Sequence, residues 1–130
     1  MNELSCKVLI VGGGPGGYVA AIRAAQLGLD VVVADSGPLG GTCLNVGCIP
    51  SKALIHAADV YRAIVDERLS KAIGIEIDAA RIDLSKTIGW KDGIVGKLNG
   101  GVAALLRKNK VRSLQGHATF VDGKTCNVTS

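Results

Sequence analysis

The sequence lacks a long hydrophobic run and has few aromatic residues for its length. Its first apolar run, Val8 to Val11, ends at three glycines, and no basic segment with a long apolar stretch precedes it. This pattern argues against a signal peptide and a membrane span, so we expect a cytoplasmic protein. The 130 residues include one Trp, two Tyr and one Phe but 18 glycines, a balance that indicates close approach between backbone segments.

Neither the charge nor the cysteine content indicates a specific ligand by itself. Hydrophobic residues make up 48% and charged residues 20% of the chain, which indicates one globular domain or a large part of one. The formal net charge is +4, but Lys and Arg are scattered apart from Arg107-Lys108-Asn109-Lys110, which is more typical of a solvated helix end than of a nucleic-acid site. Four cysteines without secretory features argue against a disulfide scaffold. A cysteine pair with an informative spacing is then expected to be catalytic or metal-binding.

The first 35 residues predict a strand, a helix and a second strand. Lys7 to Val11 and Asp30 to Asp35 are dominated by short apolar runs, as expected for parallel strands buried on both faces. Between them, small residues with a helical period begin at Gly16 and stop before Gly28, which predicts a helix that lies close to the sheet. A right-handed crossover makes the two strands parallel.

Two further helices are predicted, from Lys52 to about Val65 and from Leu84 to Lys108. The longer one carries an apolar stripe and a separate stripe of glycines, each of which costs about 1 kcal/mol relative to alanine in a helix. We therefore expect a neighbouring helix to approach the glycine stripe closely. The apolar stripe comprises Leu84, Ile88, Val95, Leu98, Val102 and Leu105, and the glycine stripe comprises Gly89, Gly93, Gly96 and Gly100.

The C-terminal residues predict a third strand and a hairpin. Val111 to Leu114 is another apolar-rich segment, and Asp122-Gly123 is a turn signal between residues 118–121 and 124–128. The predicted fold class is therefore α/β, with a parallel sheet and a small antiparallel hairpin near the C-terminus.

The segment GGGPGG at residues 12–17 contains the pattern G-x-G-x-x-G. The pattern alone is weak, but here it follows a predicted strand, opens a predicted helix and precedes a second strand that ends in Asp35. In this context it predicts a site for an adenine dinucleotide, either NAD or FAD. Asp35, at the tip of its strand, can accept hydrogen bonds from ribose hydroxyls.

The residues of this glycine loop have distinct physical tasks. Gly12 permits the tight turn, Gly14 lets a pyrophosphate approach the backbone, and Gly17 lets helix and sheet pack closely. Pro15 suits the first turn of a helix, where its missing N–H would lack an intrahelical partner. The free amide groups of that turn, which includes Gly16, lie at the positive end of the helix dipole and are expected to bind the pyrophosphate.

The stretch GGTCLNVGCIPSK places Cys43 and Cys48 five residues apart. In a regular helix such Cα atoms are about 8–9 Å apart, whereas a disulfide needs less than about 7 Å, so bridging them requires a local distortion. Gly47 loosens the backbone, and Pro50 disfavours helical geometry at the residue before it. A short, distorted loop suits a disulfide that opens and closes. A helix N-terminus and the cation of Lys52 would stabilise a thiolate there.

Three other interpretations of this cysteine pair are possible. A structural disulfide would make poor use of so short a loop, and a zinc site would need further ligands, of which His56 is the only nearby candidate. The third interpretation, that both cysteines are buried and inert, is compatible with the spacing alone. The neighbouring glycine loop favours the redox interpretation, and no metal site is expected. Cys6 and Cys126 have no such context and are expected in the core.

These motifs resemble the flavin-dependent disulfide reductases, whose signature GGTC-x-N-x-GC-x-P-x-K is matched throughout from Gly40 to Lys52. The similarity covers essentially the whole chain, from GGGPGGYVAAIRAAQLG to the segment GHATF at residues 116–120. Within the family, CLNVGCIPSKALIHAADVY and WKDGIVGKLNGGVAALL look most like the dihydrolipoamide dehydrogenase branch, in particular that of branched-chain 2-oxo acid complexes. The mercuric reductase and glutathione reductase branches are the alternatives, although glutathione reductases usually carry VPKK where this chain has IPSK.

The resemblance implies that the dinucleotide is FAD and that the cysteines are redox-active. Cys43 would be the thiol that exchanges with the substrate and Cys48 the thiolate that faces the flavin, so that an electron pair passes from a dithiol through the disulfide and FAD to NAD. Lys52 would lie near the flavin ring, and backbone near Ala118 would contact the adenine. At the ribose position the family more often has Glu than Asp. The residues implied to hold FAD are Gly12, Gly14, Pro15, Gly16, Gly17, Asp35, Gly40, Gly41, Thr42, Cys43, Lys52 and Ala118.

The resemblance also implies domains and partners outside this sequence. The family enzyme has a second nucleotide domain for NAD and a dimerisation domain that supplies a His-Glu pair, so we expect residues 1–130 to be the amino-terminal part of the FAD-binding domain, without full turnover alone. The complete enzyme would be a homodimer that oxidises dihydrolipoamide carried on a lipoyl domain of a 2-oxo acid dehydrogenase complex. Neither a nucleic acid nor a membrane is expected as a partner. The alternative from another class is a stand-alone module that binds a nucleotide without catalysis.

Overall fold

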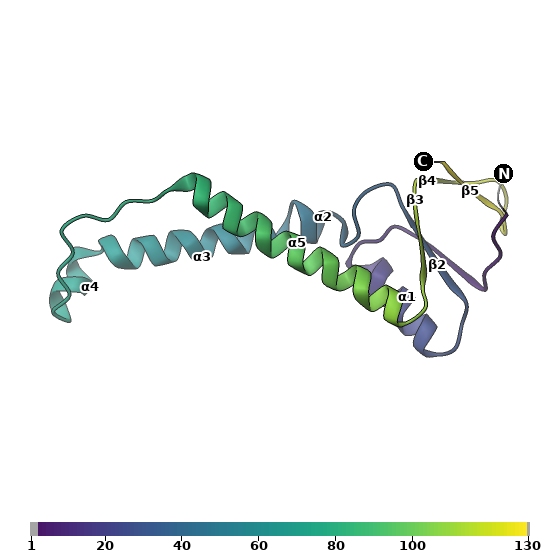
Figure 1. The fold of residues 1–130 in the computed structure, drawn as a ribbon, viewed down its shortest axis with the longest axis horizontal. Coiled ribbons are helices and arrows are strands. Elements are labelled where there is room, and N and C mark those ends of the chain that lie inside the picture. Colours follow the sequence, from purple (N-terminus) through teal and green to yellow (C-terminus); the bar gives the residue numbers. More distant parts are fainter. Residues whose placement is uncertain (1–2, 130) are drawn as a thin grey trace.

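In the computed structural model, which describes residues 3–129, the chain has a sheet-bearing end and a long helical arm (Figure 1). Its elements in order are β1 (Val8–Val11), α1 (Pro15–Gln26), β2 (Val31–Asp35), α2 (Gly41–Asn45), α3 (Cys48–Val65), α4 (Glu67–Ala72), α5 (Leu84–Lys108), β3 (Arg112–Gln115), β4 (His117–Phe120) and β5 (Cys126–Thr129). The α/β class is confirmed, whereas the short helices α2 and α4 were not expected.

The parallel sheet has the order β1-β2-β3, with β2 in the centre. Val8 pairs with Val31 and Val32 pairs with Arg112, both in parallel ladders, which confirms the predicted crossover between the first two strands. Four residues of β2, from Val31 to Ala34, are buried. A strand with neighbours on both sides and helices over it has no wet face, so its sequence is continuously apolar instead of alternating.

The core lies where α1 and α5 pack against this sheet. Ala21 of α1 is fully buried, and its small side chain lets the helix lie close to β2. Gly28 has φ +84° just after α1, which is the left-handed conformation that ends a helix and that glycine adopts without strain. The buried core cluster consists of Ala21, Val31, Val33, Leu44, Val102, Leu106 and Val111.

Helix α5 has the predicted bounds but only part of the predicted burial. It begins after Asp83, whose carboxylate accepts a hydrogen bond from the Lys86 amide at 3.1 Å. Val102 is buried as expected, but Leu106, outside the predicted stripe, is the fully buried leucine, while Leu105 is 48% exposed. The glycine stripe is also a correction: a Cβ atom built at Gly89, Gly93, Gly96 or Gly100 meets no described atom within 4 Å. No helix of the described chain packs closely on that stripe.

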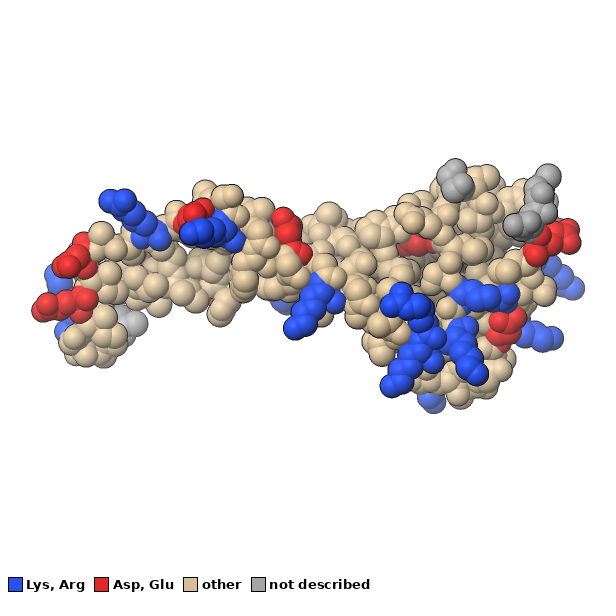
Figure 2. All heavy atoms as spheres, viewed as in Figure 1, with Lys and Arg blue, Asp and Glu red and all other residues tan. Residues whose placement is uncertain are grey.

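The arm consists of α3 and the first half of α5, which lie side by side, with α4 at its tip (Figure 1). Its surface has many exposed large apolar side chains. Figure 2 shows Lys and Arg gathered over the sheet-bearing end, whereas acidic and basic side chains are spaced along the arm with uncharged surface between them. The exposed apolar residues of the arm lie on α3, on the segment that links α4 to α5, and on the start of α5. They include Leu54, Ile55, Val60, Ile64, Val65, Ile73, Ile75, Ile77, Ile82, Leu84, Ile88 and Trp90.

The hairpin of β4 and β5 is antiparallel, as predicted from the Asp-Gly turn. The Asp122 carboxylate accepts a hydrogen bond from the Lys124 amide at 2.7 Å, and this bond lowers the pKa of Asp122 below its ordinary value. Cys126 on β5, like Cys6 before β1, is half-buried instead of lying in the core, which corrects the expectation for both. Within residues 3–129, no helix is long and apolar enough to cross a membrane.

Leu106→Ala is expected to lower the free energy of unfolding by about 2–5 kcal/mol, because it removes a fully buried side chain from between α5 and the sheet. Urea unfolding followed by circular dichroism measures the change. The matched control is Leu105→Ala on the same helix, where the side chain is 48% exposed and the loss should stay below about 1 kcal/mol. Equal losses in the two variants would contradict this assignment of the core.

Candidate functional site

The glycine loop joins β1 to α1 at the carboxyl edge of the parallel sheet. Gly12 has φ +102°, a left-handed conformation that glycine adopts without strain, and its amide donates to the Ala34 carbonyl at 2.7 Å. A Cβ atom at Gly17 would overlap the carbonyl oxygen of Gly12. The turn and the helix therefore meet backbone to backbone, which requires glycine at residue 17, whereas the left-handed conformation favours glycine at residue 12.

The start of α1 presents an open backbone surface. Gly14 is the N-cap residue and Pro15 occupies the first turn, where a missing N–H costs no intrahelical hydrogen bond. A Cβ atom at Gly14 would meet only the Gly41 Cα atom, at 3.9 Å, and one at Gly16 would meet nothing within 4 Å. The free amides of this turn and the positive end of the helix dipole suit an anionic group.

Asp35 ties the second strand to the glycine loop. Its Oδ2 accepts a short hydrogen bond from the Gly13 amide, and its Oδ1 accepts from the Gly37 amide at 2.7 Å. An ionised carboxylate has about four lone-pair sites, so acceptor capacity for ribose hydroxyls remains. The hydrogen bond from Gly13 therefore fixes the position of the carboxylate beside the glycine loop.

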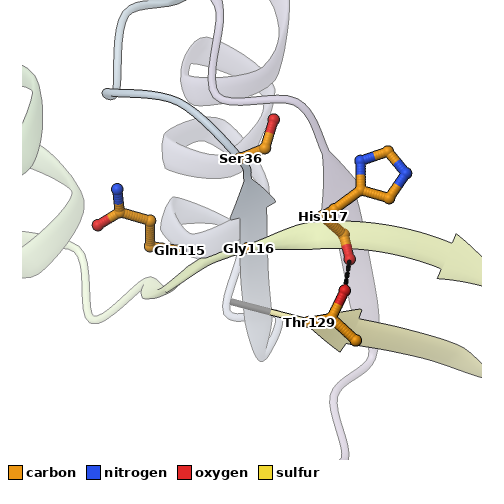
Figure 3. A pocket seen from close by; sticks show the side chains of 5 residues that line it. All are labelled: Ser36, Gln115, Gly116, His117 and Thr129. Atoms are coloured by element: carbon orange, nitrogen blue, oxygen red, sulfur yellow. Dashed lines mark hydrogen bonds between the residues drawn. The ribbon is translucent and has the colours of Figure 1, made fainter.

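A cavity of about 390 Å³ lies next to this strand end, where β2, β3 and β4 meet. Figure 3 shows the five residues that line it: Ser36, Gln115, Gly116, His117 and Thr129. The Gly116 amide donates to the Asp35 carbonyl at 2.9 Å, so the cavity wall is attached to the strand that carries the candidate ribose-binding carboxylate. Ala118, the sequence-based candidate for the adenine contact, is half-buried in β4, two residues after Gly116.

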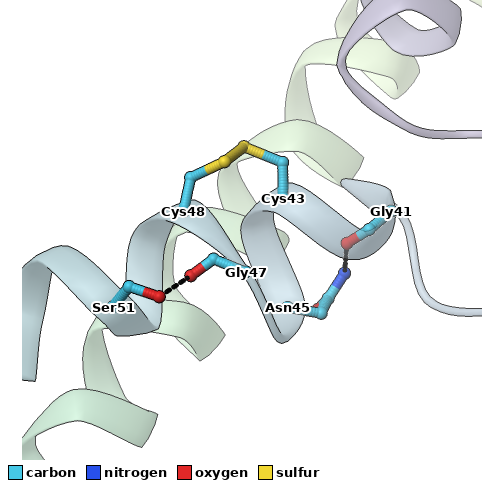
Figure 4. Close-up of a disulfide and its surroundings, with 6 residues drawn as sticks. All are labelled: Gly41, Cys43, Asn45, Gly47, Cys48 and Ser51. Carbon is cyan, nitrogen blue, oxygen red and sulfur yellow. Dashed lines mark hydrogen bonds between the residues drawn. A yellow bond between two sulfur atoms is a disulfide. The ribbon is translucent and has the colours of Figure 1, made fainter.

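Cys43 and Cys48 form a disulfide between α2 and α3 (Figure 4). Their Cα atoms are 4.7 Å apart, well below the spacing of about 8–9 Å in a continuous helix. The predicted distortion is therefore present at Gly47, as expected, whereas the expectation of non-helical geometry at Ile49, before Pro50, is wrong. Helix α3 already begins at Cys48 and includes Ile49 and Pro50, because a proline in the first turn removes no intrahelical donor.

The break between the two helices lies at Val46 and Gly47. A Cβ atom at Gly47 would come within 2.9 Å of the Thr42 carbonyl oxygen and 3.3 Å of the Cys43 Cα atom. The end of α2 and the start of α3 thus approach so closely that a side chain at residue 47 would push them apart. This close approach brings the two cysteines within disulfide distance.

The two sulfur atoms lie in different electrostatic surroundings. Cys48 is exposed in the first turn of the 18-residue helix α3, where the partial positive charge of the helix end favours a thiolate. Lys52 is exposed one turn later on the same helix, on the face that carries Cys48. Cys43 is half-buried in the five-residue helix α2, and Thr42 beside it is exposed.

The glycine loop and the disulfide segment are in direct contact. The Gly40 amide donates to the Gly13 carbonyl at 2.8 Å, and a Cβ atom at Gly41 would lie 2.7 Å from the Gly14 Cα atom. Gly40 and Gly41 both have positive φ, so the turn into α2 depends on glycine. The glycine loop, Asp35, Gly40 and Gly41 are therefore joined by direct contacts, and Thr42 and Cys43 follow in α2. Lys52 lies further along the chain on α3, and Ala118 lies in the hairpin.

Two residues of this site were missed from the sequence. The side-chain amide of Asn45 donates to the Leu39 and Gly41 carbonyls. The side-chain amide of Asn99, from α5, donates to the same Leu39 carbonyl and to the Asn45 Oδ1 atom. Asn45 belongs to the signature matched from Gly40 to Lys52, but Asn99 has no distinctive pattern in its helix, so only the fold reveals this pairing. His56, the zinc candidate, instead lies beside Trp90 on the arm, with ring centroids 6.1 Å apart. Among residues 3–129, no group of three or more His, Cys, Asp or Glu is placed to hold a metal.

Comparisons with known proteins agree on one family. A family model described as pyridine nucleotide-disulphide oxidoreductase matches residues 6–129. The chain is 56% identical over 125 residues to a dihydrolipoyl dehydrogenase from Pseudomonas aeruginosa, covering 96% of this chain and 27% of that protein. It is 50% identical over 127 residues to a dihydrolipoyl dehydrogenase from Geobacillus stearothermophilus, covering 98% of this chain and 26% of that protein. The chain thus spans about a quarter of the length of these relatives.

A solved structure shows the same architecture. It is a Cu(II) complex of RclA, an HOCl-induced flavoprotein disulfide reductase from Escherichia coli, which matches with a TM-score of 0.73 and 25% sequence identity. The match covers 92% of this chain and 24% of that protein.

Gly17→Ala is expected to destabilise the chain by about 1–3 kcal/mol, because the new methyl group would overlap the Gly12 carbonyl and force α1 away from β1. Thermal and urea unfolding measure the loss. Gly16→Ala is the matched control, since its methyl group would meet nothing within 4 Å and the substitution should leave stability equal or slightly higher. If both variants unfold at the same denaturant concentration as the original chain, the close packing at Gly17 is refuted.

Proposed function

The chain belongs to the pyridine nucleotide-disulphide oxidoreductase family, and from this premise we propose that it forms the FAD-binding, disulfide-bearing part of a dihydrolipoyl dehydrogenase. The observation that carries the proposal is the Cys43–Cys48 disulfide next to a dinucleotide-type glycine loop. The backbone of Gly41, two residues before Cys43, is in contact with Gly14 of that loop. The identity of about 50% to two dihydrolipoyl dehydrogenases favours this branch over the mercuric and glutathione reductases.

The residues present fit FAD in three respects. The backbone at Gly14 and Gly16 has open space where a pyrophosphate would approach, the Asp35 carboxylate keeps lone pairs for a ribose, and the cavity beside Gly116 would accept an adenine. Gly40 to Cys43 would line the path from the pyrophosphate to the flavin, and Lys52 and the backbone near Ala118 would complete the site. When bound, FAD would supply an acceptor for the electron pair on its way to NAD, whose domain we propose to lie outside these residues.

The chemistry of the chain itself is thiol–disulfide exchange. A thiolate of dihydrolipoamide would attack the Cys43 sulfur, form a mixed disulfide and release the Cys48 thiolate, which the N-terminus of α3 stabilises. The second substrate thiol, after losing its proton, would attack the substrate sulfur of the mixed disulfide. It closes the cyclic disulfide of lipoamide and leaves Cys43 reduced. Two electrons have then moved from substrate to protein.

The proposed partners follow from this reaction. Dihydrolipoamide would arrive on a lipoyl domain of a 2-oxo acid dehydrogenase complex, and the complete enzyme would be a cytoplasmic homodimer. The exposed apolar side chains of the arm support burial against another part of such an assembly, because a lone soluble domain rarely exposes so many in one region. Residues 1–130 would be the amino-terminal part of the FAD domain, without full turnover alone.

The proposed function predicts a change in the visible spectrum of the chain mixed with FAD. One equivalent of dihydrolipoamide, added without oxygen, should reduce the disulfide and produce a long-wavelength band from a Cys48 thiolate beside the flavin. Cys43→Ser should abolish this reduction because the exchange partner is lost, whereas Cys126→Ser, at a half-buried free cysteine, should leave it unchanged. A spectrum of free FAD that dihydrolipoamide does not alter would instead favour the non-catalytic module.

Gly14→Ala is expected to weaken FAD binding at least tenfold with little change in stability. The methyl group has room in the chain, where it would lie 3.9 Å from the Gly41 Cα atom, but it would occupy the space proposed for the pyrophosphate. Fluorescence titration with FAD gives the affinity and urea unfolding gives the stability. Gly89→Ala on the arm is the control, because its methyl group also meets nothing within 4 Å and lies away from the loop. Unchanged affinity in Gly14→Ala would place the dinucleotide elsewhere.

A further inference from the structure

Helix α2, which carries Cys43, is anchored by the side chain of its own last residue. The Asn45 side-chain amide donates to the Gly41 carbonyl at 2.9 Å and to the Leu39 carbonyl at 3.1 Å, with a longer contact to the Pro38 carbonyl at 3.4 Å. Figure 4 shows the bond from Asn45 to Gly41 across the helix from the disulfide. One side chain thus holds the turn that enters α2.

A second amide, from a distant part of the chain, completes this anchor. Asn99 of α5 donates to the Leu39 carbonyl at 2.5 Å and to the Asn45 Oδ1 atom at 3.1 Å, across 60 and 54 residues of sequence. Both asparagine side chains are half-buried, so water competes less for these bonds than it does at an exposed site. The two asparagines and the Leu39 carbonyl form what we call the amide clamp.

The clamp connects α2, the helix that carries Cys43, to α5. Helix α5 packs against both α2 and α3, and Cys48 is in the first turn of α3. When the disulfide is reduced, the covalent link between α2 and α3 is lost and the position of Cys43 depends on the remaining contacts of α2. Among those contacts, the clamp supplies side-chain hydrogen bonds, beside the backbone bond from Gly40 to Gly13.

We propose that Asn99 and Asn45 are positioning residues that keep the two thiols close together after reduction and thereby favour the disulfide. The proposal rests on the proposed function, because it takes Cys43–Cys48 as the bond that is reduced and re-formed. In the test reaction, a dithiol reagent loses two thiol hydrogens and becomes a cyclic disulfide, while the Cys43 and Cys48 sulfurs gain one hydrogen each. The closer the two protein thiols are held, the more this equilibrium favours the oxidised protein.

The experiment is an equilibration of the chain in buffers of reduced and oxidised dithiothreitol. Free thiols are trapped by alkylation, and mass spectrometry of the peptide that contains both cysteines gives the reduced fraction. Asn99→Asp keeps the size of the side chain but replaces the donor with a carboxylate that faces two acceptor oxygens. The equilibrium constant for reduction should rise about tenfold, a shift of about 30 mV.

Two further variants test the clamp as a unit. Asn109→Asp removes a similar bond, from the Asn109 side chain to the Leu105 carbonyl at 2.8 Å, at the far end of the same helix, and should leave the equilibrium unchanged. Asn45→Ala should shift it in the same direction as Asn99→Asp. The double variant should shift it by clearly less than the sum of the two, since each single change already breaks the shared bond.

The outcomes separate the two proposals. If the original chain exchanges reversibly with the buffer but Asn99→Asp and Asn45→Ala do not shift the equilibrium, or shift it additively, the clamp has no positioning role and the proposed function is untouched. If the original disulfide does not exchange with the buffer at all, the proposed function fails as well. Should Asn99→Asp lose its helical circular dichroism, Asn99→Ala decides the same question without adding a charge.

Discussion

The site depends on a backbone contact between the glycine loop and the turn that leads into α2. The Gly40 amide binds the Gly13 carbonyl, and the Cα atoms of Gly14 and Gly41 are so close that a side chain at residue 41 has no room. Without this contact, the nucleotide-type loop and the disulfide would belong to separate parts of the surface. With it, the N-terminal ends of α1 and α2 meet, so the proposed dinucleotide at the start of α1 would lie close to the segment that carries Cys43.

Close contact between backbone segments, made possible by a glycine, recurs at two other positions near the site. Gly17 lets α1 touch the turn at Gly12, and Gly47 lets the start of α3 touch the end of α2. Because such contacts bury backbone atoms without filling space with side chains, the site is built from fixed backbone positions and tolerates little substitution. The high glycine content therefore has a local explanation in this half of the chain, whereas the glycines of α5 face open space.

The sequence predicted most of the elements that have strong periodicity, and it failed where tertiary contacts decide. The unit β1-α1-β2 and the bounds of α5 were predictable because burial on known faces leaves a repeating pattern. The five-residue helix α2 is too short to show a period, and Pro50 was read as a helix breaker although it lies in a first turn. Leu105 and Leu106 both fit a helical stripe, so the packing of α5 on the sheet, and not the pattern, determines which one is buried. The hydrogen bond between Asn45 and Asn99, 54 residues apart, was not predictable, because the signature that includes Asn45 does not indicate its partner.

The disulfide is asymmetric in a way that supports different roles for its two sulfur atoms. Cys48 is at the positive end of an 18-residue helix, whereas Cys43 is in a five-residue helix whose own dipole is small. When the bond opens, negative charge is therefore more stable on Cys48, and in a thiol–disulfide exchange the sulfur that leaves most readily is the one whose thiolate is most stable. An attacking thiolate that displaces Cys48 must bond to Cys43. The lengths of the two helices thus support the proposal that Cys43 is the exchanging thiol and Cys48 the lasting thiolate.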